Sequence, residues 1–191
     1  MQFAITWDYL CPFARNANEA VVVGLKDGRD WDVTFQAFSL SQVHTEKDET
    51  PVWDREELPS GVLALAWGVA VRDEFPESFL DAHTALFAAR HEDGLDLNDE
   101  VVLRDAVASV GLDPDRVAAV VASGVPLKTI AREHTDGVER HAVFGVPTFI
   151  ADDEAVFVRL MGRWDVDAVQ RVLDQLPWTA LNEFKRTRIP R

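Results

Sequence analysis

WDYLCPFA, residues 7–14, joins an apolar run typical of a strand to a run with helical periodicity. It holds Cys11, the one cysteine of the 191-residue chain, with Pro12 directly after it. A helix N-terminus is a common place for a reactive thiol, because the unpaired N–H groups and the helix dipole stabilise an anion. Ala14 stands at the fourth position of what would otherwise be a Cys-x-x-Cys pair, so Cys11 has no resolving cysteine in this chain.

This position predicts a functional role for the Cys11 sulfur. Cysteines at helix N-termini have pKa values of roughly 3.5–7.5 instead of about 8.5, so we expect a thiolate at neutral pH. The thiolate is the attacking species in disulfide exchange and in addition to electrophiles. The alternative is a small buried core residue, which is a common setting for a free cysteine.

The composition bounds the class of protein. The length fits one domain or a domain with a large insertion, and 47% hydrophobic residues are typical of a globular protein. The formal net charge of −14 opposes binding to nucleic acid or to anionic membranes. The chain has no apolar stretch long enough for a membrane helix, and its N-terminus lacks the regions of a signal peptide. With a single cysteine, this predicts a cytoplasmic protein.

Hydrophobic periodicity predicts strands near both ends of the chain and helices between them. The expected elements are a strand at 2–6, a helix at 12–26, a strand at 31–38, a loop at 41–59, helices to about 142, strands at 147–151 and 155–160, and a helix at 165–176. The order β-α-β, helices, β-β-α is that of an α/β thioredoxin fold with a large α-helical insertion. We therefore predict a thioredoxin-like domain from residues 1–45 and 143–191, and a helical insertion domain from residues 46–142.

A second motif, GVPTF at residues 145–149, stands at the start of the third predicted strand. Gly-Val-Pro-Thr at this place marks the cis-proline turn of thioredoxin-like proteins. A cis Val146–Pro147 bond would place the Val146 backbone beside the Cys11 sulfur, where it can pair with an extended substrate. The alternative is an ordinary trans proline that opens an edge strand.

Together these motifs resemble the DsbA-like branch of the thioredoxin superfamily. Within it, FSL at residues 38–40 and HEDGLDL at residues 91–97 resemble two groups of enzymes. One is the kappa-class glutathione transferases and 2-hydroxychromene-2-carboxylate isomerases. The other is the mycothiol-dependent nitroreductases of actinobacteria, whose Leu-Cys-Pro-aromatic turn is similar to LCPF at residues 10–13. The chain departs from both dithiol and serine-containing members: the former have a cysteine at the position of Ala14, and kappa and isomerase enzymes typically have a serine at the position of Cys11.

The resemblance implies a cytoplasmic monothiol oxidoreductase. Cys11 would attack a disulfide or electrophile, and a small cellular thiol that is not tightly bound, mycothiol or glutathione, would release the mixed disulfide. The residues expected to bind the substrate or the thiol are Pro12, Phe13, Arg15, Val146, Pro147 and Thr148. Two alternatives stay open: a glutathione-dependent isomerase or transferase in which Cys11 only hydrogen-bonds the cofactor sulfur, and a non-catalytic binding protein.

The remaining polar residues predict neither a metal nor a nucleotide site. The five histidines show no metal-ligand spacing with Cys11, and the chain has no Gly-rich phosphate-binding loop. His83 lies on an apolar helix face, where we expect a satisfied interior histidine and not a base directed at Cys11. Arg15, one turn after Cys11, would stabilise the thiolate or an anionic substrate, or else point into solvent. Homodimer formation stays open.

Overall fold

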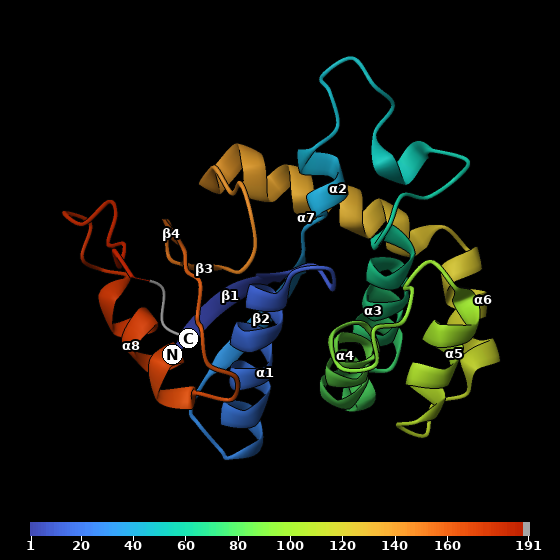
Figure 1. The fold of residues 1–191 in the computed structure, drawn as a ribbon, viewed down its shortest axis with the longest axis horizontal. Coiled ribbons are helices and arrows are strands. Elements are labelled where there is room, and N and C mark those ends of the chain that lie inside the picture. Colours follow the sequence, from blue (N-terminus) through green and yellow to red (C-terminus); the bar gives the residue numbers. More distant parts are fainter. Residues whose placement is uncertain (189–191) are drawn as a thin grey trace.

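A four-stranded sheet forms the centre of the computed structural model, which describes residues 1–188 (Figure 1). The strand order is β2-β1-β3-β4, with β2 parallel to β1 and with β3 and β4 antiparallel to their neighbours. The strands are β1 (Gln2–Trp7), β2 (Asp32–Ala37), β3 (Thr148–Ala151) and β4 (Glu154–Phe157). This is the predicted thioredoxin arrangement, since the two parallel strands come first and the hairpin comes last.

The register of the sheet brings the two sequence motifs to one edge. In the parallel pair Trp7 lies opposite Ala37, so the chain leaves β1 and β2 at the same edge. Because β3 runs antiparallel to β1, it begins at this edge too. The Cys11 turn, residues 38–40 and residues 145–147 are therefore neighbours, although about 135 residues separate the first from the last.

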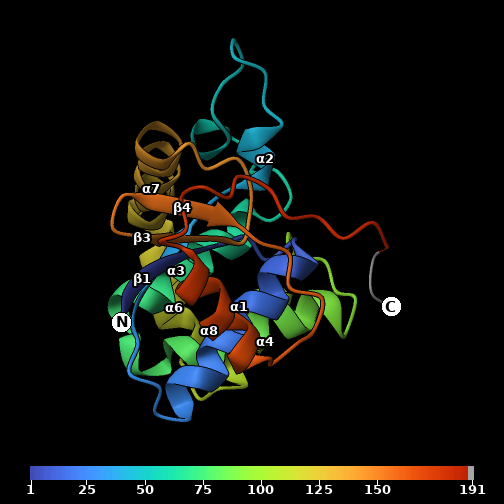
Figure 2. The same cartoon turned by 90° about the vertical axis from the view of Figure 1, so that its left-hand side faces the viewer.

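Helices cover both faces of the sheet. α1 (Pro12–Lys26) and α8 (Val166–Gln175) pack together on one face, and α7 (Val125–His141) contacts β2 on the other (Figure 2). α1 begins at Pro12, where the missing N–H of proline costs no hydrogen bond. It ends before Gly28, whose φ of +80° is a conformation that glycine adopts without strain.

The predicted insertion forms a helical layer beside the sheet (Figure 1). Its helices are α3 (Val62–Glu74), α4 (Pro76–His91), α5 (Glu100–Ala108), α6 (Pro114–Ala122) and α7. One hydrophobic core runs from the sheet into these helices and includes Trp7, Phe35, Trp67 and Phe87. Because the core is continuous, the boundaries at 45/46 and 142/143 stay predictions, and the last three residues of the predicted 143–191 segment lie outside the described residues.

Two segments differ from the expectation. The predicted loop at 41–59 contains α2 (Leu40–Val43) and a short 3-10 helix, η1 (Val52–Asp54). Ser39 caps α2 by accepting the Gln42 N–H at 3.3 Å, and the Gln42 side chain accepts the Val52 N–H at 2.9 Å, which ties the two short helices together. The last strand, expected to reach residue 160, ends at Phe157, because its partner β3 starts at Thr148 and no further ladder pair is available.

The described helices are not suited to spanning a membrane. Every helix within residues 1–188 is too short or too polar to cross a lipid bilayer.

Candidate active site

Cys11 is the N-cap residue of α1, as its position in the sequence predicted. The half-buried sulfur accepts a hydrogen bond from the Ala14 N–H at 3.4 Å. The thiol in turn donates to the carbonyl oxygen of Val146 at 3.3 Å, and the Val146–Pro147 peptide bond is cis. The first helical turn and the loop before β3 thus hold the sulfur between them.

The expectation of a thiolate at neutral pH is wrong. Burial raises the pKa of the Cys11 thiol above its ordinary value, while the N–H groups of Ala14 and Phe13 lower it by a smaller amount. The Asp8 carboxylate raises this pKa further and the Arg159 guanidinium lowers it. The resting group is a protonated thiol, which agrees with its hydrogen bond to the Val146 carbonyl.

Asp8 lies inside the turn that precedes Cys11. Its carboxylate is 1% exposed and accepts the Leu10 N–H at 2.9 Å and the Leu40 N–H at 2.8 Å. It therefore joins the Cys11 turn to the start of α2. Burial raises the pKa of Asp8 to about 6, and the two backbone N–H groups oppose that rise.

A buried hydrogen-bond chain begins at the next residue, Tyr9. The Tyr9 hydroxyl bonds the Nδ1 of His83 at 2.8 Å, and the Nε2 of His83 bonds the Oδ1 of Asn18 at 3.2 Å. Burial lowers the pKa of His83 to about 3, so this imidazole is neutral. The prediction of a satisfied interior histidine agrees with this placement. We call Asp8, Tyr9, Asn18 and His83 the inner network.

A second group of side chains near Cys11 is aromatic and cationic. The guanidinium of Arg159 lies 5.4 Å from the ring centroid of Phe13 and 5.4 Å from that of Phe157. The Phe157 ring in turn lies 5.1 Å from that of Phe144, whose side chain is 67% exposed. We call Phe13, Phe144, Phe157 and Arg159 the outer ring.

The whole length of the fold matches one family model. A DSBA-like thioredoxin domain matches residues 5–174. The chain belongs to this family. Membership supports the expectation of a thiol-dependent oxidoreductase, and the matched residues include Cys11. No curated protein sequence matches the chain.

Solved structures of this family's fold are similar to the chain at low sequence identity. A probable DsbA oxidoreductase from Streptomyces coelicolor is 18% identical, with 97% of this chain and 93% of that chain covered and a TM-score of 0.65. A 2-hydroxychromene-2-carboxylate isomerase is 15% identical, with 94% and 98% covered and a TM-score of 0.65. The thiol-disulfide exchange protein alpha-DsbA2 from Wolbachia pipientis is 18% identical, with 92% and 81% covered and a TM-score of 0.64. These likenesses show the fold.

Within this DsbA-like fold, the residues expected to bind a substrate are only partly accessible. Pro12 is exposed and Phe13 half-buried, whereas Val146, Pro147 and Thr148 are buried. The Thr148 N–H donates to the Thr6 hydroxyl at 2.8 Å, and its own hydroxyl donates to the Gly145 carbonyl at 2.8 Å. Thr148 therefore holds the shape of the loop before β3, and Val146 contributes its carbonyl to the Cys11 thiol.

Arg15 is directed away from the sulfur into an ion-pair network. The side chain is buried and donates to Glu19 at 2.8 Å and to Glu92. Arg163 donates to the same two carboxylates, at 2.7 Å to Glu19 and 2.8 Å to Glu92. Arg15 thus ties α1 to the end of α4 and to the segment after β4, and its donors are already paired with protein carboxylates.

Sequence reasoning missed Arg159, Phe157 and Phe144. The available signal was the two-residue spacing of Phe157 and Arg159, because residues at i and i+2 of an extended segment point the same way. That spacing indicates a shared direction but not which surface it faces. The contact with Phe13 comes only from the tertiary fold.

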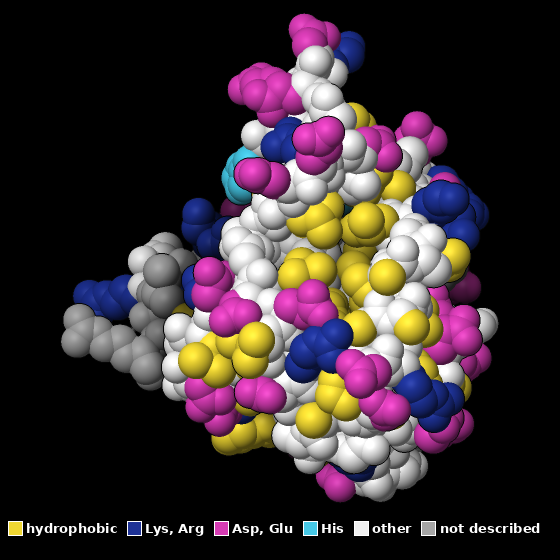
Figure 3. Space-filling model, turned by 90° about the vertical axis from the view of Figure 1, so that its right-hand side faces the viewer, with side chains coloured by type: hydrophobic (Ala, Val, Ile, Leu, Met, Phe, Trp, Pro, Cys, Tyr) yellow, Lys and Arg dark blue, Asp and Glu magenta, His cyan; other side chains and the backbone are white. Residues whose placement is uncertain are grey.

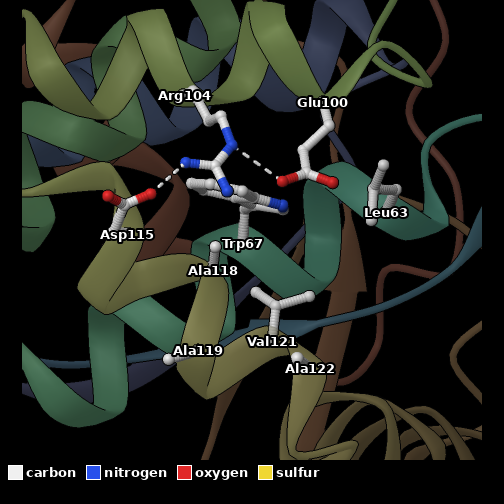
Figure 4. A pocket seen from close by; sticks show the side chains of 9 residues that line it. All are labelled: Leu63, Trp67, Glu100, Arg104, Asp115, Ala118, Ala119, Val121 and Ala122. Atoms are coloured by element: carbon white, nitrogen blue, oxygen red, sulfur yellow. Dashed lines mark hydrogen bonds and ion pairs between the residues drawn. The ribbon is translucent and has the colours of Figure 1, made fainter.

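The insertion has a hollow of its own, of about 420 Å³, between α3, α5 and α6 (Figure 4). Arg104 lies over the Trp67 ring, 5.9 Å from its centroid, and pairs with Glu100 at 2.8 Å and Asp115 at 2.7 Å. Apolar side chains gather on this face of the molecule, with acidic and basic ones around them (Figure 3). Since its arginine is already paired and the thiol lies elsewhere, we place the chemistry at Cys11.

Within the described part of the chain, no three His, Cys, Asp or Glu side chains lie close enough together to hold a metal ion.

Proposed function

We propose that the protein is a monothiol thiol–disulfide oxidoreductase with Cys11 as its nucleophile. The observation that carries this proposal is the position of the Cys11 sulfur at the α1 N-terminus, between the Ala14 N–H at 3.4 Å and the Val146 carbonyl at 3.3 Å. The N–H groups of the first turn are available to a thiolate once the proton has left. The half-buried sulfur is open to a small disulfide.

The reaction runs in two exchange steps. In the first, the Cys11 thiol loses its proton to solvent, and the thiolate attacks one sulfur of a disulfide. A Cys11–substrate disulfide forms and the other half leaves as a thiolate. In the second, the thiolate of a small cellular thiol attacks the substrate sulfur, and Cys11 leaves as a thiolate. The substrate half is then disulfide-bonded to the small thiol, and the enzyme returns to its starting state.

The second thiol must come from outside the chain. Position 14 carries a methyl group with 0% exposure, and the sequence has no other cysteine. We propose glutathione or mycothiol as the outside thiol, weakly bound, and the reducing cytoplasm as the compartment that supplies it. The raised pKa makes Cys11 a slower leaving group in the second step, so this route needs the small thiol in excess over the enzyme.

The test is to expose the protein to oxidised glutathione or oxidised mycothiol and to measure its intact mass. We expect one adduct, located on Cys11 by peptide mapping, that a reduced small thiol removes. The Cys11→Ser variant should form none. Absence of an adduct on the wild type over the pH range where the thiol ionises would exclude the proposal.

Ala14→Cys tests the monothiol character directly. The variant restores the Cys-x-x-Cys spacing at a helix N-terminus, so oxidation should close an internal disulfide at the expense of the small-thiol adduct. Quantified thiol content after oxidation checks this. A persistent adduct at Cys11 in the variant would show that position 14 cannot reach the sulfur.

A glutathione-dependent isomerase is the second candidate, favoured by one observation. The Cys11 thiol is protonated and donates to the Val146 carbonyl, so it can equally donate to the sulfur of a bound cofactor. Cys11→Ser separates the two candidates. Serine keeps a donor and should retain isomerisation of a hydroxychromene carboxylate, whereas disulfide exchange needs sulfur and should be lost.

A further inference from the structure

The outer ring contacts both segments that hold the Cys11 sulfur, namely the turn at Phe13 and the loop at Gly145. Phe13 lies two residues after Cys11 and faces Arg159, and Arg159 faces Phe157. A Cβ at position 145 would come within 3.3 Å of the Phe157 ring, so this ring sits directly on Gly145, next to the Val146 carbonyl that binds the thiol. The guanidinium is therefore linked through ring contacts to both segments that hold the sulfur, and its charge acts on the Cys11 thiol.

The backbone on both sides of Arg159 is fixed to the site. The Val158 N–H donates to the carbonyl of Pro147 at 3.2 Å. The Leu160 carbonyl accepts the side-chain amide of Asn16, on α1, at 2.8 Å. Since both neighbours are bonded to the loop before β3 and to α1, Arg159 stays in register with Cys11.

Arg159 also keeps its donors available. Throughout residues 1–188, Arg15 and Arg163 are ion-paired with buried or half-exposed carboxylates, whereas Arg159 makes cation–π contacts and no ion pair. Its side chain is exposed. An exposed guanidinium that contacts ring faces keeps its N–H groups free to bind a carboxylate.

We propose that Arg159, held between Phe13 and Phe157, binds a carboxylate of the small disulfide or thiol that reacts with Cys11. This rests on the proposed function and specifies its substrate class: anionic, carboxylate-bearing thiols and disulfides. Exposed Phe144 extends the apolar surface beside the charge, which suits a substrate with a hydrophobic or aromatic part next to its carboxylate. Of the two thiols named above, glutathione bears free carboxylates, whereas the cysteine carboxyl of mycothiol is tied up in an amide bond.

The negative net charge of the protein makes the positive charge of Arg159 important for the approach of an anionic substrate. At −14, the overall field repels an anionic substrate. An anion that reacts readily with Cys11 must therefore meet a local positive charge.

The test compares two aromatic disulfide probes, anionic dithiobis(nitrobenzoate) and neutral dithiodipyridine. For each probe, the rate constant for reaction with Cys11 is divided by the rate constant for reaction with mercaptoethanol. Charge selectivity is the normalised value for the anionic probe divided by the normalised value for the neutral probe. A change in the thiol pKa alters both rates alike and leaves the ratio unchanged. We expect Arg159→Gln to lower the ratio about fivefold, as the loss of a favourable exposed ion pair would. Arg159→Lys should keep part of it, and Arg171→Gln, at an exposed arginine of α8, should leave it unchanged.

A second measurement uses the wild-type protein. Benzoate should slow the reaction of Cys11 with dithiodipyridine, while neutral benzamide at the same concentration should not. An unchanged ratio in Arg159→Gln, or equal effects of benzoate and benzamide, would overturn the carboxylate site and leave the proposed function intact. If neither probe reacts with Cys11, the proposed function itself fails.

Discussion

On its inner side the Cys11 turn rests on the inner network, in which Asp8 accepts N–H groups of this turn and of the start of α2. The other three groups, Tyr9, His83 and Asn18, are hydrogen-bonded in series. On its outer side it meets the outer ring, in which Phe144 is 67% exposed and Arg159 faces solvent. The charges differ in the same way: Asp8 raises the pKa of the Cys11 thiol and Arg159 lowers it. The inner side thus contributes stability and adds to the rise in the Cys11 pKa that burial mainly causes, while the outer side is placed to receive a substrate.

The largest expected effect is a difference in the free energy of unfolding between a substitution in the core behind the Cys11 turn and one in the outer ring. Phe87 lies at 0% exposure, 4.8 Å from the Tyr9 ring in the inner core, and Phe144 belongs to the outer ring. Phe87→Ala should lower the free energy of unfolding by about 3–5 kcal/mol, because it leaves a cavity in a close-packed core. Phe144→Ala should change it by no more than about 0.5 kcal/mol. Urea denaturation measures both, and equal losses would show that the outer ring is part of the core.

The next effect concerns Asp8 and pH. Its folded pKa, about 6, lies above the ordinary value of 3.8. The stability that its protonated form contributes is therefore fully present below pH 3.8 and is lost as the pH rises through 6. Asp8→Asn removes this titration. The variant's free energy of unfolding relative to the wild type should therefore rise by up to about 3 kcal/mol between pH 4 and pH 7.

Denaturation of both proteins at several pH values checks this prediction. Asp153→Asn, at an exposed carboxylate in the β3–β4 turn, is the matched control and should show a constant difference from the wild type. A constant difference for Asp8→Asn as well would mean that water reaches the Asp8 carboxylate.

The two motifs of the site can be predicted from the sequence, whereas most of the residues around them cannot. Cys11 at a helix N-cap and Pro147 at the start of a strand follow from local signals, because each motif sits at a boundary between periodic segments. The α/β order and the bounds of α1, Pro12–Lys26, follow from the same periodicity. The length of the β3–β4 hairpin does not follow from periodicity, because β4 ends at the residue that pairs with the first residue of β3.

The two arginines show why the rest is not predictable. Arg15 has Glu19 at the i+4 position, which a sequence shows, but its burial depends on Glu92 and Arg163, which come from distant segments. Arg159 contacts Phe13, although the whole helical insertion separates the two residues in the sequence. The pKa of Cys11 likewise depends on burial by the loop before β3, so a helix N-terminus alone predicts the wrong direction.

The smallest expected effect tests whether the two sides act on the sulfur with opposite sign. Asp8→Asn removes a negative charge that raises the pKa of Cys11, so the midpoint of its alkylation by iodoacetamide should move to lower pH. Arg159→Gln removes a positive charge that lowers this pKa, so the midpoint should move to higher pH. Because the reagent is neutral, binding at Arg159 contributes nothing to either rate. Full pH–rate profiles measure both midpoints, with Arg171→Gln as the control at an exposed arginine outside the outer ring. Shifts in the same direction would show that the variants act by changing the packing around the thiol. Opposite shifts would establish that the Asp8 carboxylate and the Arg159 guanidinium adjust, in opposite directions, a pKa that burial mainly determines.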